Sequence, residues 1–511
     1  MRKPGNKSRG KKKTAKAPPR SHAGIGDHKV VGKTLVPPLA QVPGLNLVSW
    51  INDRLPELLW AVLIRARLTR DGALTVFRRI LRYINEKRPE SFEGQITHTG
   101  LSRVNPDVLA DLLRVMVAGA AERDALLPLL LLDGLPARNR WVTALGQPSA
   151  PTDWAPLMRA VALTLDHKSE EATDCRWMSL MAGWAIGKLL FPGKIVEGEG
   201  EFEVVSAMPE LTDGLLRYPK AGDMGAHVRA AELMVDGLLQ TKSEWAGAFW
   251  NECMSKTPCC ALRLSGPAGA PVSGTNLERV REVRETIILH AHSTRVTTGL
   301  DARHDSVFGV ALYCLDLLHE LMLGANAGSI LARMGLRSIL ECYVTLAYLV
   351  HEESPHTWES FRTYGAGQAK LAFLKLEDVD HAPRYVTIES LRLLANEDMW
   401  QDFLQVNLGH WNKTDLRMLS IKADVKEVYD RFYGWTSCFA HGHWGALREC
   451  AFDVCGNPLH RLHRVPRAEA RSMPDVVPDA CELVDKVLEL VSRCYPVFEA
   501  RITMEFRGRL T

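Results

Sequence analysis

Apolar residues recur at helical spacing in one segment after another, and this pattern constrains the fold of the chain more than any other feature. The first stripe on one helix face consists of Ile51, Leu55, Leu58, Leu59, Val62 and Leu63. Glycine and proline clusters separate each helical pattern from the next. Further helices are expected at about 71–85, 105–118, 122–132, 152–166, 174–191, 225–250, 277–294, 304–324, 327–351, 354–377, 384–406, 422–440 and 478–504. The sequence therefore predicts an all-α fold.

Only residues 194–206 alternate well enough between apolar and polar to predict a small strand hairpin. The segment 256–276 is rich in proline, glycine and serine and has no periodicity, which is typical of a linker. A chain of 511 residues is too long for one ordinary core. We therefore expect an N-terminal helical domain at 41–255 and a C-terminal helical bundle at 277–511.

In the last part of the C-terminal bundle we expect one long helix and, before it, a long connection. The final helix is expected to start near Pro478 and to be kinked at Pro496, because proline is favoured in a first turn and disrupts a helix interior. Residues 450–476 contain several prolines and no periodicity, so they are interpreted as a long connection.

The basic character of the chain belongs to its first residues. The net charge is +3, but residues 1–20 contain nine Lys and Arg and no acid, so the remainder carries 3 − 9 = −6. A segment this polar cannot offset its own ordering entropy, and residues 1–40 are predicted to be a disordered tail. Its cations, among them Lys11, Lys12, Lys13 and Lys16, predict binding to RNA or DNA. The alternative is a solvated terminus that only aids solubility.

Composition also limits the cellular setting. No apolar run is long enough to cross a membrane, and the first residues lack the apolar core of a secretory signal. Eleven scattered cysteines fit free thiols better than a disulfide framework. We therefore expect a cytoplasmic protein without a membrane partner, and the oligomeric state stays open.

Two polar ladders interrupt the apolar helices of the C-terminal half. One is Arg337-x3-Glu341 and the other is Tyr433-x3-Ser437-x3-His441. Residues four apart share a helix face, with Cβ atoms about 5–6 Å apart. A cation, a carboxylate, a phenol, a hydroxyl and an imidazole could together line one cleft, so these five residues are the candidate catalytic site. The alternatives are an ordinary ion pair in the first ladder and a histidine held by the helix dipole in the second.

Cysteines and histidines also gather after the second ladder. Cys450, Cys455, His460 and His463 follow a Cys-x4-Cys-x4-His-x2-His spacing. This spacing differs from that of zinc fingers, in which a longer loop and helix separate the two pairs. No metal ligand and no cofactor are therefore predicted, although binding of a metal by these four residues stays open.

A family resemblance rests on the two ladders and on a third segment between them. Together with Phe361, Tyr364 and Gly365, the ladders resemble a bacterial family catalogued only as a domain of unknown function, number 5677. The resemblance covers about 280–505 and implies an all-α domain with no assigned activity. It also implies that Arg337, Glu341, Tyr433, Ser437 and His441 form one cluster.

A looser similarity is to HEPN helical-bundle ribonucleases, whose motif is an arginine followed after four to six residues by a histidine. Here nine residues separate Arg431 from His441. Arg337, from another helix, could supply the cation instead.

Two hypotheses follow, and they leave open whether the chain is an enzyme. The first is a non-enzymatic binding or regulatory module, for instance a stress or phage-defence sensor, with a buried polar cluster and a nucleic-acid-binding arm. The alternative is a metal-independent ribonuclease, in which His441 is the general acid or base and Arg337 stabilises the phosphorane charge.

Overall fold

The computed structural model describes most of the chain. The described residues are 25–41, 48–87, 92, 96–146, 153–186, 194–197, 200–203, 225–232, 243–262, 277–323, 327–377, 379, 383–396, 406, 411–412, 414–461 and 463–503. They fall into two compact units. Unit 1 comprises residues 1–261 together with 455–463, and unit 2 comprises 262–454 together with 464–511.

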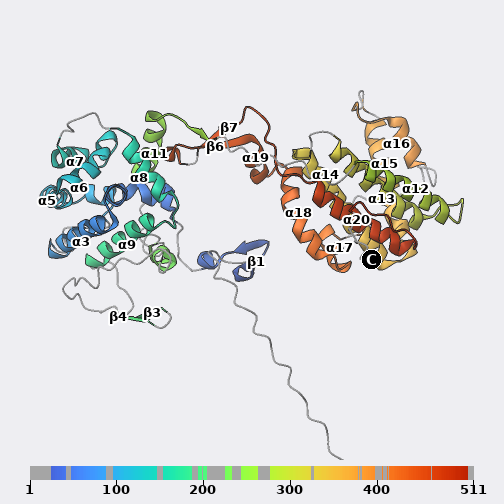
Figure 1. The fold of residues 1–511 in the computed structure, drawn as a ribbon, viewed down its shortest axis with the longest axis horizontal. Helices are drawn as coiled ribbons and strands as arrows, with labels where there is room; N and C mark the ends of the chain where they lie inside the picture. The colour runs from blue at the N-terminus through green and yellow to red at the C-terminus, as the bar shows by residue number, and fades with distance from the viewer. Residues whose placement is uncertain are drawn as a thin grey trace, which may run out of the picture. The chain divides into compact units, whose positions relative to one another are not determined.

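Helices dominate both units, as the apolar spacing predicts (Figure 1). The predicted hairpin is confirmed by strands β3 (Lys194–Glu197) and β4 (Gly200–Glu203), which pair antiparallel with Lys194 opposite Glu203. The chain is therefore predominantly all-α. No helix in the described part of the chain is both long enough and apolar enough to cross a membrane.

Unit 1 is a group of helices of one to five turns. Its helical elements are η1 (Ile25–Asp27), η2 (Pro38–Gln41), η3 (Trp50–Arg54), α1 (Leu55–Glu57), α2 (Leu59–Arg67), α3 (Arg70–Lys87), α4 (His98–Ser102), α5 (Pro106–Met116), α6 (Ala120–Leu126), η5 (Leu127–Leu131), α7 (Arg138–Leu145), α8 (Ala155–Leu165), α9 (Glu170–Ala185), α11 (Glu244–Lys256) and η6 (Pro458–His460). Residues 225–232 are also helical. Polar caps set several starts: Ser169 and Ser243 each accept a hydrogen bond from a backbone amide in the first turn of α9 and α11.

Helix α2 lies at the centre of unit 1. Seven consecutive residues, from Leu59 to Arg65, are buried, because α8, α9 and α3 pack around it. A helix that is apolar on every side is stable only when it is surrounded in this way. Trp60 is fully buried, and its indole Nε1 donates to the carbonyl oxygen of Ile96 at 2.8 Å.

Buried charges in unit 1 are paired. The Asp174 side chain is 0% exposed and accepts hydrogen bonds from Arg65 Nε at 2.8 Å and from Arg70 Nη2 at 2.9 Å. Glu232 is likewise buried, beside Arg54 at 3.4 Å and Arg176 at 2.8 Å. Burying a carboxylate is tolerated only with such partners, so these clusters fix the neighbouring helices in one arrangement.

Unit 2 is a helical bundle. Its helices are α12 (Leu277–Thr294), α13 (Ala302–Met322), α14 (Ile330–Glu352), α15 (Pro355–Glu377), α16 (Ile388–Ala395), α17 (Leu416–Lys422), α18 (Lys426–Ala440), α19 (Trp444–Ala451) and α20 (Val477–Cys494). Helix α14 is the central element, and α13, α17, α18 and α20 all pack against it (Figure 1). Its apolar residues Leu336, Ile339, Leu340, Val344 and Leu346 are buried in the core. The polar stripe of α14 therefore lies where neighbouring helices approach.

Strands occur where the sequence predicts none. β1 (Lys29–Val31) and β2 (Thr34–Val36) form an antiparallel hairpin, with Gly32 at φ +60° in the turn. This hairpin lies in the range that the sequence assigns to a disordered tail. β6 (Phe452–Cys455) and β7 (Arg464–Pro466) also pair antiparallel, inside the range interpreted as a connection. Each of these strands has only three or four residues, too few for a clear alternation.

Other element boundaries need correction as well. Helix α20 ends at Cys494 rather than being kinked at Pro496, since Tyr495 already has non-helical angles. Helices α4, α7, α17 and α19 were not predicted, because each has eight residues or fewer and shows little periodicity. Residues 455–463, which the sequence places in the C-terminal bundle, belong to unit 1.

Candidate functional site

The first ladder forms an ion pair along α14. Arg337 Nη2 lies 2.8 Å from Glu341 Oε1, as expected for residues four apart on a helix. The two side chains differ in exposure: Arg337 is 13% exposed and Glu341 is 42% exposed. The guanidinium is thus largely enclosed by protein, whereas the carboxylate reaches solvent.

The second ladder contributes Tyr433 to the same place. Its ring lies under the Arg337 guanidinium, with 4.6 Å from Cζ to the ring centroid, and Arg337 Nη2 donates to the Tyr433 hydroxyl at 3.2 Å. Stacking on the ring and a charge-assisted hydrogen bond both favour the charged guanidinium. The structure therefore brings Arg337, Glu341 and Tyr433 together, across the contact between α14 and α18.

Burial distinguishes this cluster from a surface pair. Arg337 Nη1 is buried and has no hydrogen-bond partner among the described residues. Tyr429 stacks on Tyr433, with ring centroids 4.4 Å apart, and burial together with the neighbouring phenol raises the pKa of Tyr429 to about 12. The Tyr429 phenol is therefore neutral near neutral pH.

The rest of the second ladder lies elsewhere. His441 is the C-cap residue of α18; its side chain is exposed, and its ring lies 5.7 Å from that of His443. Gly442 follows at φ +59°, which is the left-handed position that commonly ends a helix. Ser437 accepts the His441 backbone amide through its carbonyl oxygen. Within the described part of the chain, no hydrogen bond or ion pair joins Ser437 or His441 side chains to Arg337.

Helix length explains this separation. His441 is eight residues beyond Tyr433, which corresponds to about 12 Å along a helix axis. The Arg337 guanidinium of α14 lies over Tyr433, two turns of α18 before His441. Arg431, the alternative upstream cation, instead lies 3.4 Å from Glu482 on the surface.

The third motif segment is partly buried, and its Phe361 packs against the core of unit 2. Phe361 on α15 packs edge-on against Trp411, with ring centroids 5.4 Å apart, and Trp411 also contacts Tyr348 of α14. Arg362 forms an ion pair with Asp305 of α13. These contacts give the segment a packing role. The predicted nucleic-acid ligands Lys11, Lys12, Lys13 and Lys16 lie outside the described residues.

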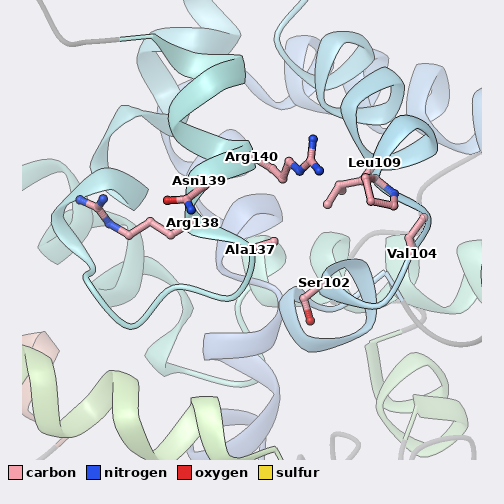
Figure 2. A pocket seen from close by; sticks show the side chains of 8 residues that line it. Ser102, Val104, Leu109, Ala137, Arg138, Asn139 and Arg140 are labelled. Carbon is pink, nitrogen blue, oxygen red and sulfur yellow. The ribbon is translucent and has the colours of Figure 1, made fainter.

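A pocket of about 300 Å³ opens in unit 1, and none of the predicted site residues is among the residues that line it (Figure 2). Its wall includes Ser102, Leu109, Asn139 and Arg140. Arg138 also contributes to the wall, but its guanidinium donates to the carbonyl oxygens of Leu130 and Leu132. The lining contains no carboxylate, histidine or cysteine, so it offers no general acid or base.

The four residues with metal-ligand chemistry are divided by the structure. Cys450 lies on α19, and its Sγ is 3.9 Å from Met473 Sδ. Cys455, His460 and His463 lie together and are joined by Cys259, whose Sγ is within 4.8 Å of one ligand atom of each. Sequence reasoning missed Cys259, because it precedes the others by almost two hundred residues. The available signal was the Cys259-Cys260 pair at the end of α11.

Comparison with known families finds one match. Residues 317–454 match the model of a family described as a family of unknown function (DUF5677). The predicted resemblance is thereby confirmed for this part of unit 2. The matched region contains both ladders and the Phe361–Gly365 segment. No comparison supports the looser similarity to HEPN bundles.

Searches of curated proteins and of solved structures find no match.

Proposed function

We propose that the chain is a non-enzymatic binding module in which the Arg337–Glu341–Tyr433 cluster fixes the packing of α18 on α14. The observation that carries this proposal is the burial of the Arg337 guanidinium. It is 13% exposed, stacked on Tyr433 and paired with Glu341. A cation that neutralises a phosphate in a transition state must reach that phosphate, and this one is already enclosed.

The position of His441 supports the same proposal. Ribonuclease chemistry would need the imidazole and the guanidinium within reach of one phosphate. His441 is exposed beyond the last turn of α18, about 12 Å along the axis from Tyr433. The alternative of a metal-independent ribonuclease therefore requires a rearrangement of α18, whereas the binding module requires none.

The N-terminal segment is the proposed nucleic-acid contact. Nine Lys and Arg without an acid in residues 1–20 give a polycation that attracts RNA or DNA phosphates, with counterion release as the driving force. The absence of aromatic residues in this segment removes base stacking, so binding should be insensitive to sequence. Such an arm would tether unit 1 and unit 2 to nucleic acid and leave recognition to the helical units. A role in stress or phage-defence sensing is compatible with this arrangement.

The cysteines support a reducing compartment. None of the eleven forms a disulfide, and six of them are buried. Burial raises the pKa of Cys253 to about 12 and that of Cys494 to about 11. These thiols are therefore unreactive near neutral pH, and a cytoplasmic location is proposed on that basis.

The experiment that tests the arm is a salt titration of RNA binding. Full-length protein is compared with a variant in which Lys11, Lys12, Lys13 and Lys16 are changed to Gln, using fluorescence anisotropy with a labelled single-stranded RNA. Each phosphate contact to a single strand contributes about 0.7 to the slope of log K against log salt, so loss of four contacts should reduce the magnitude of that slope by about 3. The matched control changes Lys29 and Lys33 of the β1–β2 hairpin to Gln and should leave the slope unchanged. Equal slopes for wild type and the four-lysine variant would contradict the proposed arm.

A further inference from the structure

Two cysteines and two histidines of unit 1 place their ligand atoms around one point. One side-chain atom each of Cys259, Cys455, His460 and His463 lies within 4.8 Å of the other three. Cys259 Sγ is 3.6 Å from His460 Nδ1 and 3.8 Å from His463 Nδ1, and Cys455 Sγ is 3.3 Å from His460 Nδ1. With zinc bonds of about 2.3 Å to sulfur and about 2.0 Å to nitrogen, ligand atoms at tetrahedral corners are roughly 3.3–3.8 Å apart. The observed spacing fits a tetrahedral metal site.

Two separate stretches of chain build this arrangement. The first is the end of α11, where Thr257 and Pro258 lead directly to Cys259. The second is residues 455–463, in which Asn457 Oδ1 accepts from the Leu459 amide and caps η6. The two stretches meet because Leu459 is fully buried in the unit 1 core and η6 packs on α11 and α8.

A compact turn directs both histidines toward the same point. Arg461 has φ +46°, a left-handed conformation that reverses the chain after η6. The His463 amide then donates to the His460 carbonyl at 2.8 Å, and the Cys455 amide donates to the His463 carbonyl at 2.7 Å. These backbone bonds fix Cys455, His460 and His463 as one preformed unit.

Hydrogen bonds around His460 determine which ring nitrogen is free. The Thr257 hydroxyl donates its single hydrogen to the Cys253 carbonyl at 2.8 Å, so its oxygen is an acceptor for its other neighbours. Asn457 Nδ2 donates to this oxygen at 2.9 Å, and His460 Nε2 lies 2.9 Å from it. This arrangement favours the tautomer with the proton on His460 Nε2, in which the Nδ1 lone pair faces the two cysteine sulfurs.

This is the arrangement that a histidine ligand to a metal usually has. A metal-bound imidazole donates its other N–H to a neighbouring oxygen, which orients the ring and fixes its tautomer. A backbone amide also supports a cysteine ligand, since Cys260 N–H points to Cys455 Sγ at 3.3 Å. Neither the hydrogen bond from His460 Nε2 nor the one from the Cys260 amide to Cys455 Sγ is needed if the four side chains only pack together.

We propose that Cys259, Cys455, His460 and His463 bind one zinc ion. Two thiolates and two imidazoles in tetrahedral geometry are typical of zinc, and four protein ligands leave no open position for a substrate. The site is therefore structural. The chain passes between the two units at three points, which are after residue 261, before residue 455 and after residue 463. Each of these points lies within two residues of a proposed zinc ligand. The ion would hold residues 455–463 on α11, closing a loop of nearly two hundred residues.

Metal content of the full-length protein tests the proposal. Protein purified without chelators should contain about one zinc ion per chain by elemental analysis. Cys259→Ser, at the exposed ligand, should lose most of that zinc. The matched control is Cys260→Ser, which changes the adjacent exposed cysteine outside the ligand set and should keep the full stoichiometry.

Cobalt substitution provides a second readout that does not depend on zinc retention. Cobalt-loaded wild type should show the intense visible bands of a tetrahedral site and a thiolate-to-cobalt charge-transfer band, which Cys259→Ser should weaken. Thr257→Val keeps all four ligands but removes the acceptor for His460 Nε2–H, so zinc affinity should fall about 10–100-fold. Folded wild type that neither contains zinc nor gives these bands with cobalt would overturn the proposal. A Cys259–Cys455 disulfide in the purified protein, or equal zinc loss in Cys260→Ser, would do the same.

Discussion

The energetic coupling between Arg337 and Tyr433 follows directly from their geometry. Tyr433→Phe removes only the hydroxyl that accepts from Arg337 Nη2 at 3.2 Å and keeps the ring under the guanidinium. Arg337→Met keeps most of the buried stem and removes the charge. Since Arg337 Nη1 has no partner among the described residues, loss of the Tyr433 hydroxyl leaves the guanidinium with Glu341 alone.

The expected magnitude comes from the exposure of the two groups. A hydrogen bond to a charged group contributes about 1.5–3 kcal/mol when it is buried. Tyr433 is half-buried and Arg337 is 13% exposed, so the lower end of the range applies, and we expect Tyr433→Phe to cost about 1.5 kcal/mol. The double-mutant cycle with Arg337→Met should give a coupling of about the same size. Glu341→Gln, at a residue that is 42% exposed, should cost only a few tenths of a kcal/mol.

Hydrogen exchange measured by mass spectrometry is the suitable assay, because a chain of two units need not unfold in one transition. Peptides from α14 and α18 report the free energy of opening at the cluster itself, and peptides from α5 in unit 1 provide an internal control. A coupling below about 0.3 kcal/mol, with Tyr433→Phe no more destabilising than Glu341→Gln, would contradict this prediction. The cluster would then be an ordinary surface ion pair.

Two further predictions concern unit 1. Burial lowers the pKa of His98 to about 3, so below about pH 6.5 the unfolded state binds a proton that the folded state does not, and the free energy of unfolding should fall by up to about 1.4 kcal/mol per pH unit. Urea midpoints measured at pH 7 and pH 5 should therefore change less in His98→Phe than in wild type, and equal changes in the two proteins would contradict this. Asp174→Asn removes the buried carboxylate that accepts hydrogen bonds from Arg65 and Arg70 and should cost about 3–5 kcal/mol in urea unfolding. Asp111→Asn, in an exposed ion pair, should cost only about 0–1 kcal/mol; similar losses in the two variants would show that burial of the ion cluster does not matter.

Periodic helices were the part of the fold that the sequence predicts well. The pattern at 277–294 corresponds to α12 residue for residue, and the pattern at 354–377 corresponds closely to α15. Long amphipathic helices repeat their apolar stripe over several turns, which makes them easy to recognise. Helices of two turns and strands of three residues carry too few repeats, so α7, α19 and the β6–β7 hairpin were missed.

Local spacing predicts contacts within a helix and says less about contacts between helices. Arg337 and Glu341 pair because they are four apart on α14. The same rule groups Tyr433, Ser437 and His441, yet of these three only Tyr433 contacts Arg337. Successive turns of α18 face different turns of α14, since Phe439 lies under Arg333 instead. Cys259 lay beyond any local pattern, since tertiary folding alone brings it to Cys455 and His460.

We propose that the Arg337–Glu341–Tyr433 cluster stabilises a binding module and that the chain does not cleave RNA. The most direct test is the integrity of a labelled single-stranded RNA incubated with full-length wild type, Arg337→Ala and His441→Ala, with bound RNA quantified in the same samples. We predict that wild type binds the RNA and leaves it intact, and that His441→Ala, a change at an exposed residue, behaves identically. Cleavage by wild type that both substitutions abolish would contradict the account and establish a ribonuclease built on these two residues.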